Sequence, residues 1–313
     1  MKTVLATTSS FAKHAPEILS YLNDKGLRFV NNAFGRKITE DELRLLLEKY
    51  KPVGLLAGTE PITQAILKEA KDYLKVISRV GVGWDNVDRK AAQELGIQVY
   101  RTEGVLNEAV AELTLGMILC ALRTIPLHNS QVHSGVWQKG MGSLLQDKVV
   151  GIIGFGAIGQ RVGELVKAFN ARVIYHDPVP AKVSWAKALP LHEMLPQADI
   201  ITIHASGSDQ ILGEYELNSL CKQGMIVVNT ARGGLVDEKA LYKALVSGRV
   251  AFACLDVFEN EPYSGPLCSL DNVILTPHIG SYALEARVAM EKKAVENLIR
   301  GLEFRRQEPE CRS

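Results

Sequence analysis

The sequence lacks an excess of either charge: 36 Lys and Arg stand against 35 Asp and Glu, which gives a formal net charge of +1. A nucleic-acid-binding protein normally carries a basic stripe, and a protein that adsorbs to an anionic membrane carries a polybasic patch. Neither nucleic acid nor membrane is therefore expected as a partner. Hydrophobic residues make up 47% and charged residues 23% of the chain, proportions typical of a globular protein rather than a disordered one.

Long apolar runs and paired cysteines are also lacking. The apolar run at residues 113–122 has about half of the ~20 residues that a membrane-spanning helix needs, and the N-terminal apolar stretch is too short for a signal peptide. A cytoplasmic location is therefore expected. The cysteines are odd in number, widely spaced and free of zinc-ligand spacing, so we expect free thiols and no metal site. They are Cys120, Cys221, Cys254, Cys268 and Cys311.

The first part of the chain alternates short apolar runs with amphipathic ones. Strands are predicted at residues 3–7, 27–31, 53–57, 76–78 and 98–100, and helices at residues 16–25, 40–50, 63–70 and 86–95. Thr39 and Glu42 have capping-box spacing at the start of the second helix, and Ile38 and Leu43 have the spacing of a hydrophobic staple. Strands and helices that alternate in this way predict a parallel α/β sheet.

A second α/β unit is predicted after an apolar helix at residues 107–122, which is apolar over most of its circumference and so is expected to be buried. Strands follow at residues 149–153, 172–175, 200–203, 225–229, 251–256 and 273–275. Gly224 and Gly248 stand where helix C-caps belong. The last helix is predicted from residue 282 to about residue 300, ending at Gly301, with a frayed polar tail at residues 304–313.

A cofactor-binding motif follows the strand at residues 149–153. Gly154, Gly156 and Gly159 form a G-x-G-x-x-G that opens a helix, which is the context that a dinucleotide-binding turn requires. Asp177 follows the next strand, where an aspartate accepts hydrogen bonds from the adenosine ribose and repels a 2′-phosphate. NAD is therefore predicted as the cofactor; the alternative is a glycine-rich turn with an unrelated loop aspartate.

Ionisable side chains follow three later strands, at the sheet edge where parallel α/β proteins bind ligands. Arg232 lies in a glycine-bounded loop and can hold a carboxylate through two hydrogen bonds; the alternative is a surface or pyrophosphate contact. Glu261 and His278 flank one strand, so contact between them is geometrically possible and would form an acid–base pair. Otherwise the acidic residues at 256–261 are a solvated loop and His278 is structural.

Six stretches, in this order, resemble the D-isomer-specific 2-hydroxyacid dehydrogenases, and among them the short forms of 3-phosphoglycerate dehydrogenase. They read SRVGVGWDNVD (residues 78–88), AVAE (109–112), GIIGFGAIG (151–159), NTARGG (229–234), LDVFENEP (255–262) and TPHIG (276–280).

The resemblance implies roles for individual residues. Arg232 would bind the substrate carboxylate, His278 would be the general acid–base, and Glu261 would be the acid that pairs with it. Asp256 would contact the nicotinamide carboxamide, and further NAD contacts would come from Ala157, Ile158, Asp177, Thr230 and Gly280. Val82 and Gly83 would grip the substrate carboxylate through backbone N–H groups, with Arg79 as a substrate-binding cation. Asp85 or Asn86 is interpreted as the cap of the helix that follows.

The resemblance also implies a fold and an assembly. A doubly wound Rossmann NAD-binding domain (residues 101–283) would be inserted in a flavodoxin-like substrate domain (residues 1–100 plus 284–313), with the active site in the cleft between them. Cleft closure would exclude water before hydride transfer. A homodimer is expected, with residues 126–142, including Trp137, as its interface arm.

Departures from the family pattern concern the substrate. Ala57 stands where an arginine is expected, and Glu60 would repel a phosphate, whereas Arg79 and Arg101 remain as candidate cations. Residues 205–209 lack the usual proline-containing loop. No C-terminal regulatory domain is expected. The predicted substrate is 3-phosphoglycerate, in serine biosynthesis; the alternatives are glyoxylate, hydroxypyruvate or another 2-oxo acid, and more distantly an NAD-sensing corepressor-like scaffold.

Overall fold

The computed structural model describes residues 1–207 and 209–307, and the chain forms two compact units. Residues 1–106 and the chain from residue 281 onward make the first unit, and residues 107–280 make the second. Ser208, Cys311 and residues 308–313 of the expected tail lie outside the described residues.

The first unit is built on a five-stranded parallel sheet in the order β2-β1-β3-β4-β5. This is the flavodoxin-like order, and it reverses direction between β1 and β3. The strands are β1 (Lys2–Ala6), β2 (Leu27–Val30), β3 (Gly54–Ala57), β4 (Val76–Arg79) and β5 (Gln98–Arg101). All four residues of β3 and of β4 are buried, as expected for central strands covered on both faces.

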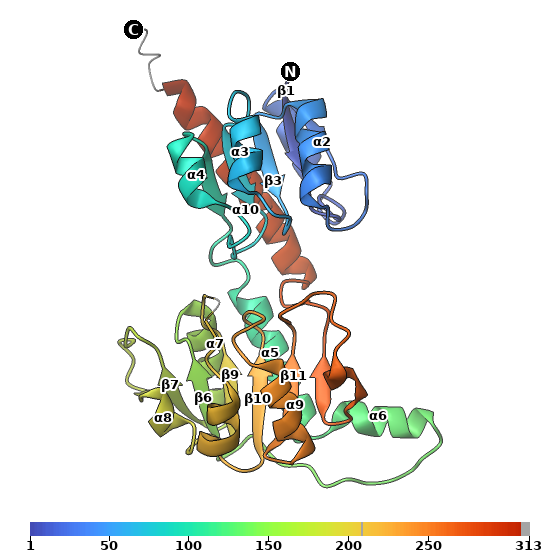
Figure 1. Ribbon diagram of the computed structural model, residues 1–313, viewed down its shortest axis with the longest axis vertical. Coiled ribbons are helices and arrows are strands. Elements are labelled where there is room, and N and C mark those ends of the chain that lie inside the picture. The colour runs from blue at the N-terminus through green and yellow to red at the C-terminus, as the bar shows by residue number, and fades with distance from the viewer. Residues whose placement is uncertain (208, 308–313) are drawn as a thin grey trace. The chain divides into compact units, whose positions relative to one another are not determined.

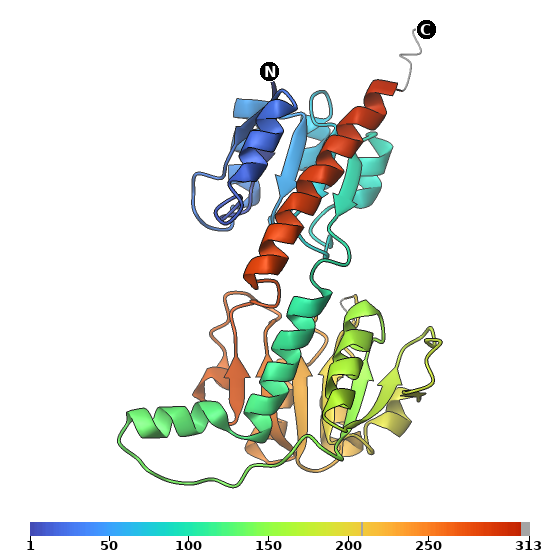
Figure 2. The ribbon, with the colours of Figure 1, turned by 180° about the vertical axis from the view of Figure 1, so that it is seen from behind.

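Five helices cover this sheet. They are α1 (Glu17–Asp24), α2 (Glu40–Tyr50), α3 (Gln64–Ala70), α4 (Arg89–Glu94) and α10 (Leu284–Gln307). Helices α2, α3 and α4 lie on one face, and α10 crosses the other face with α1 beside it (Figures 1 and 2). The apolar sides of α2, α3 and α4 form one buried cluster with β1, β3 and β4.

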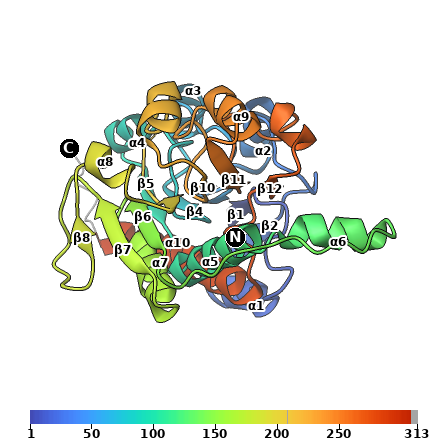
Figure 3. The same ribbon diagram turned by 90° about the horizontal axis from the view of Figure 1, so that it is seen from below.

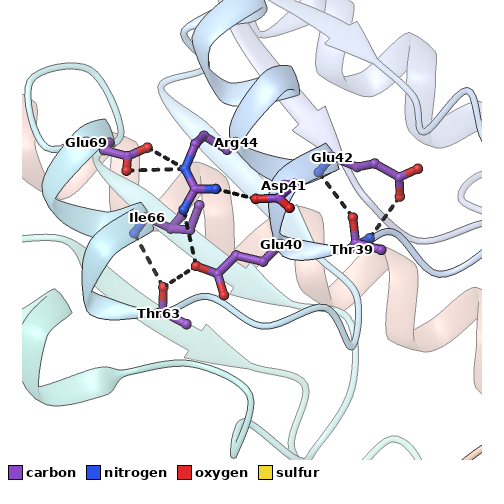
Figure 4. Close-up of polar contacts among 8 residues, drawn as sticks. All are labelled: Thr39, Glu40, Asp41, Glu42, Arg44, Thr63, Ile66 and Glu69. Carbon is purple, nitrogen blue, oxygen red and sulfur yellow. Dashed lines mark hydrogen bonds and ion pairs between the residues drawn. The ribbon is translucent and has the colours of Figure 1, made fainter.

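Hydrogen bonds join helices α2 and α3. Thr39 and Glu42 form the predicted capping box. Arg44 of α2 donates to Asp41 (2.6 Å) and to both carboxylate oxygens of Glu69 in α3 (3.0 and 3.2 Å). Glu40 accepts from the hydroxyl of Thr63, the N-cap of α3 (2.8 Å), so one network connects both helices (Figure 4).

Two predicted helix limits in this unit are wrong. Helix α10 passes through Gly301 to Gln307, so residue 301 does not end it and residues 304–307 are helical. A Cβ at Gly301 would lie 2.8 Å from Tyr100 Cε2, so this glycine serves close packing on the sheet. Helix α4 begins at Arg89 and its N-cap is Asp88, not Asp85 or Asn86.

The second unit has a seven-stranded parallel sheet in the order β12-β11-β10-β9-β6-β7-β8. Its strands are β6 (Val149–Ile153), β7 (Arg172–His176), β8 (Lys187–Ala188), β9 (Ile200–Ile203), β10 (Met225–Asn229), β11 (Val250–Leu255) and β12 (Val273–Leu275). Read from β8, the first six strands have the Rossmann order, which reverses between β6 and β9. The predicted doubly wound fold class is confirmed for both units.

Helices cover both faces of this sheet. They are α5 (Asn107–Leu122), α7 (Ala157–Ala168), α8 (Leu191–Met194), α9 (Glu238–Val246), a π-helix (Glu216–Leu220) and a 3-10 helix (Pro266–Ser269). Helices α5 and α7 share one buried cluster on one face, and α8, α9 and the π-helix share another on the opposite face (Figure 3). The expected burial of α5 is confirmed by its seven buried residues.

Helix α6 (Ile125–His133) was not predicted from the sequence pattern. It belongs to the second unit and projects away from the sheet of that unit (Figure 1). None of its residues is buried, so no apolar periodicity marks it in the sequence. No single described helix is long and apolar enough to cross a membrane, although α5 and α6, bent by 64°, meet that test when taken together.

Candidate active site

The glycine-rich turn joins β6 to α7 and leaves a helix N-terminus open. Gly156 is the N-cap of α7, no side chain caps the helix, and a Cβ at Gly156 would point into open space, with no atom within 4 Å apart from its chain neighbours and its own helix. Ala157 is exposed and Ile158 is half-buried beside it. A Cβ at Gly159 would lie 2.1 Å from the Gly154 carbonyl oxygen, so that position admits only glycine. This turn can bring backbone N–H groups and the helix dipole to a diphosphate.

Asp177, directly after β7, is tied to the same turn. Its Oδ2 accepts the N–H of Phe155 (2.7 Å), and its Oδ1 accepts the N–H of Val179 (2.8 Å). Each oxygen keeps a lone pair for a further donor. Two ribose hydroxyls can use these lone pairs, so the open turn and the carboxylate together fit a dinucleotide without a 2′-phosphate.

The loop that carries Arg232 follows β10 and is held by a buried asparagine. The side-chain amide of Asn229 donates to the Arg232 carbonyl (2.8 Å), and its oxygen accepts the N–H of Ala231 (3.1 Å). A Cβ at Gly233 would lie 1.9 Å from the carbonyl oxygen of Phe258, so this loop touches the loop after β11. Asn229 was not predicted from the sequence, because it reads as the last residue of an apolar strand.

The predicted acid–base pair is in contact. His278 Nδ1 lies 3.1 Å from Oε1 and 3.0 Å from Oε2 of Glu261. Glu261 Oε1 also accepts the N–H of Phe258 (3.2 Å), which orients the carboxylate. About half of the His278 side chain and 39% of the Glu261 side chain are exposed, so the pair faces solvent and is accessible to a small molecule.

Asp256 is buried at the end of β11 and contacts the His278 loop. Its Oδ1 accepts the hydroxyl of Thr276 (2.5 Å) and the N–H of Ile279 (2.8 Å), and its Oδ2 accepts the N–H of Gly280 (2.8 Å). The structure therefore places two predicted cofactor residues, Asp256 and Gly280, against each other.

Thr230 is also buried. Its hydroxyl lies 2.9 Å from that of Thr114 in α5, which itself donates to the Val110 carbonyl (2.7 Å). Thr230 is therefore the donor of this pair, and the bond fixes the start of the Arg232 loop on α5. Among the described residues, no three His, Cys, Asp or Glu side chains gather as a metal site requires.

Residues predicted to bind substrate lie in the first unit, after β4. Val82 and Gly83 are half-buried, and the Gly81 carbonyl accepts the N–H of Thr102 (3.0 Å). Arg79 is 9% exposed, and its guanidinium donates to the Val80 carbonyl. Arg101 stacks on Trp84, with 4.2 Å between the guanidinium carbon and the ring centroid.

The reversal point between β1 and β3 is occupied by a buried carboxyl. Glu60 is 1% exposed and accepts the Thr7 hydroxyl and the N–H of Gly58 (3.1 Å). The same Gly58 N–H also points at the Thr7 oxygen (2.8 Å). Burial raises the pKa of Glu60, while the Thr7 hydrogen bond and the charge of Arg79 oppose that rise.

His204 is a further residue that the sequence did not single out. It follows β9 beside the glycine turn, where a Cβ at Gly154 would lie 2.4 Å from the N of Ala205. Its Nε2 lies 2.9 Å from the Thr202 hydroxyl, and its buried Nδ1 has no partner among the described residues. Burial lowers the pKa of His204 to about 3, so this ring is neutral.

Residues 115–280 match the family described as D-isomer specific 2-hydroxyacid dehydrogenase, NAD binding domain. The chain is 42% identical to a D-3-phosphoglycerate dehydrogenase of Methanocaldococcus jannaschii over 80% of its own length, and it spans 50% of that protein. It is 37% identical to a glyoxylate reductase of Pyrococcus furiosus, covering 88% of both chains. The chain is also similar to the solved structure of the TT0316 protein of Thermus thermophilus, with a TM-score of 0.88 and 36% identity. The aligned region covers 96% of this chain and 97% of the TT0316 chain.

Proposed function

This chain belongs to the D-isomer-specific 2-hydroxyacid dehydrogenase family and carries its NAD-binding domain, and from that premise we propose a specific reaction. It transfers a hydride between C2 of a D-2-hydroxy acid and NAD, using Arg232, Glu261 and His278. The contact between Glu261 and His278 carries this proposal, because it joins residues 17 positions apart into an acid–base pair at an exposed sheet edge.

In the reductive direction, Arg232 binds the carboxylate of a 2-oxo acid through its planar guanidinium. NADH, held by the glycine turn and Asp177, would supply the hydride that adds to C2. His278, as the imidazolium, gives its proton to the carbonyl oxygen as that oxygen gains negative charge. Glu261 stabilises the imidazolium and orients the ring, and the Arg232 guanidinium stabilises the developing alkoxide.

The cofactor proposal assigns the diphosphate to Gly154, Gly156 and the first turn of α7 at Ala157, Ile158 and Gly159. Asp177 takes the ribose hydroxyls. Thr230, Asp256 and Gly280 stay proposed contacts on the nicotinamide side. The second unit thus binds NAD, and Arg79, Val82 and Gly83 of the first unit recognise the substrate.

The first substrate candidate is 3-phosphohydroxypyruvate, the oxidised partner of 3-phosphoglycerate in serine biosynthesis. It is supported by the resemblance and by the dehydrogenase relative at 42% identity. Arg79 is the cation that this candidate requires. The side chain of Arg101 is less suited to phosphate, because it stacks on Trp84 and donates to Glu103 (2.6 Å).

The second candidate is an unphosphorylated 2-oxo acid, such as glyoxylate or hydroxypyruvate. One observation favours it: the carboxyl of Glu60 is buried at the carboxyl ends of the paired strands β1 and β3 and already accepts the Gly58 N–H. A phosphate at that edge would meet an acid instead of a donor. The Pyrococcus glyoxylate reductase agrees with this candidate.

A panel of 2-oxo acids, assayed by NADH absorbance, separates these candidates. Preference for 3-phosphohydroxypyruvate supports the first, and turnover only of unphosphorylated acids supports the second. Absence of turnover with NADH still bound would exclude the acids of the panel and leave an untested substrate or a scaffold role.

The proposed acid–base pair is tested by His278→Ala, which should lower kcat by about 100-fold or more while NADH still binds. His192→Ala is the matched control, because that side chain is 71% exposed in α8, a helix that carries none of the predicted site residues. Equal kcat values for wild type and His278→Ala would remove His278 from the mechanism.

We also propose a homodimer whose interface arm is residues 126–142, which include most of α6. Trp137 is 83% and Met141 99% exposed, an apolar surface of the kind that a second copy covers. The double variant Trp137→Ser, Met141→Ser should shift the sedimentation coefficient to that of a monomer. The control Tyr215→Ser, at an exposed aromatic residue outside the arm, should not.

The proposed cytoplasmic location is supported by the four described cysteines, which are free.

A further inference from the structure

The loop that carries His278 has an unusual backbone. His278 has a φ of 55°, in the left-handed region that non-glycine residues seldom adopt, and its N–H donates to the Thr276 carbonyl two residues earlier (2.9 Å). A residue keeps such a conformation only where its surroundings hold it. Contacts from outside the loop must therefore hold this turn and aim the ring at Glu261.

The side chain of Asp256 supplies those contacts. It accepts a hydroxyl from Thr276, before His278, and two N–H groups from Ile279 and Gly280, after it. The backbone N–H of Asp256 donates to the carbonyl of Asn229 in the neighbouring strand β10 (2.9 Å), so the sheet fixes the backbone that carries this carboxylate. Three donors from one short loop therefore converge on one buried anion.

Gly280 completes this arrangement. A Cβ there would lie 3.1 Å from Asp256 Oδ2 and 3.4 Å from a methyl carbon of Val110 in α5. A side chain at this position would push the loop away from the carboxylate. The glycine thus serves the approach of its own N–H to Asp256.

We propose that Asp256 is a positioning residue that fixes the His278 loop in its left-handed turn, so that Nδ1 of His278 faces Glu261. This inference rests on the proposed role of His278 as the acid–base group. It adds to the proposed contact of Asp256 with the nicotinamide side, because that contact acts on cofactor affinity, whereas positioning of His278 acts on kcat at saturating NADH.

The first test is Asp256→Asn. The asparagine oxygen can replace Oδ1, but its NH₂ group would face the N–H of Gly280, donor against donor, and the loop would shift. We expect kcat at saturating NADH to fall about 10- to 100-fold. An increase of about 10-fold in the Kd for NADH, measured by fluorescence, with that kcat unchanged would overturn the proposal and leave Asp256 as a cofactor contact alone.

A matched pair at Thr276 keeps the proposal testable if Asp256→Asn fails to fold. Thr276→Val removes the hydroxyl at nearly constant volume and should lower kcat by about 3- to 10-fold. Thr276→Ser keeps the hydroxyl and should restore kcat to within about 2-fold of wild type. Equal kcat values for the Val and Ser variants would overturn the proposal.

NMR spectra of the histidine rings in the cofactor-free protein separate this inference from the proposed reaction. Seven histidines are present, and the His278 signal is the one that disappears in His278→Gln. Asp256→Asn should change the chemical shift of this signal, because the ring leaves its place beside the Glu261 carboxylate. An unchanged signal refutes positioning even if the enzyme is active, whereas a changed signal without turnover of any 2-oxo acid refutes only the proposed function.

Discussion

Replacement of His204 by glutamine should make the second unit less sensitive to acid. His204 follows β9, next to the glycine turn, and its backbone N–H donates to the carbonyl of Ile153 in β6 (2.7 Å). Nδ1 is buried without a partner among the described residues, so a proton there has no acceptor. Burial consequently lowers the pKa of His204 to about 3.

The size of the effect follows from proton linkage. The unfolded chain binds a proton on His204 near its ordinary pKa of about 6.5, whereas the folded chain does so only near 3. The stability from the neutral ring is therefore complete above about pH 6.5 and is lost as the pH falls toward 3. Between about pH 7.5 and pH 5, this loss is about 2 kcal/mol of unfolding free energy.

Urea unfolding of the wild type and His204→Gln at about pH 7.5 and pH 5 measures this term. Groups other than His204 titrate in both proteins and cancel in the difference. If the two units unfold in separate transitions, the relevant one is that which moves to higher urea on addition of NADH. The stability of the wild type relative to His204→Gln should fall by about 2 kcal/mol, and a change below about 0.5 kcal/mol would show that the ring is not held neutral by burial.

Three further substitutions have expected outcomes. Glu60→Gln should raise the unfolding free energy at neutral pH but not below about pH 4, and urea unfolding at both pH values measures this difference. Burial raises the pKa of Glu60, so the wild type loses stability as the pH rises through that raised pKa. Gly159→Ala should weaken NADH binding measured by fluorescence, since its Cβ would lie 2.1 Å from the carbonyl oxygen of Gly154. Arg44→Met should lower the Tm at low salt, and less at high salt, because its carboxylate partners are exposed; equal losses would refute an ionic cause.

The two sheets could be predicted because their strands are short apolar runs at regular spacing. Buried strands such as β3 and β6 have no polar face, so composition alone marks them. The glycine turn was predictable for a related reason: Gly154, Gly156 and Gly159 meet a steric requirement that shows directly in the residue type. Local chemistry is therefore sufficient for these parts of the protein.

Contacts between distant segments were not predictable in the same way. Asp256 reads as one of several acids in a loop, and only the parallel register of β11 and β12 brings it under Ile279 and Gly280. Gly301 reads as a helix end, although tertiary packing against Tyr100 is what requires it. The residue type of Asp256 and Gly301 is visible in the sequence, but the role of each depends on a neighbour that is distant in the sequence.

Glu60 shows why the same limit matters for substrate choice. From the sequence, it is a loop acid that would repel a phosphate through solvent, where screening makes repulsion weak. In the structure it is buried and accepts the Gly58 N–H, one of the backbone donors that an anion would need at the carboxyl ends of β1 and β3. The stronger obstacle to a phosphate here is thus the loss of a donor together with the presence of a poorly solvated acid. A phosphate bound by Arg79 would consequently lie near this acid, because the charge of Arg79 already acts on Glu60, whereas a smaller 2-oxo acid has no group that needs to approach it.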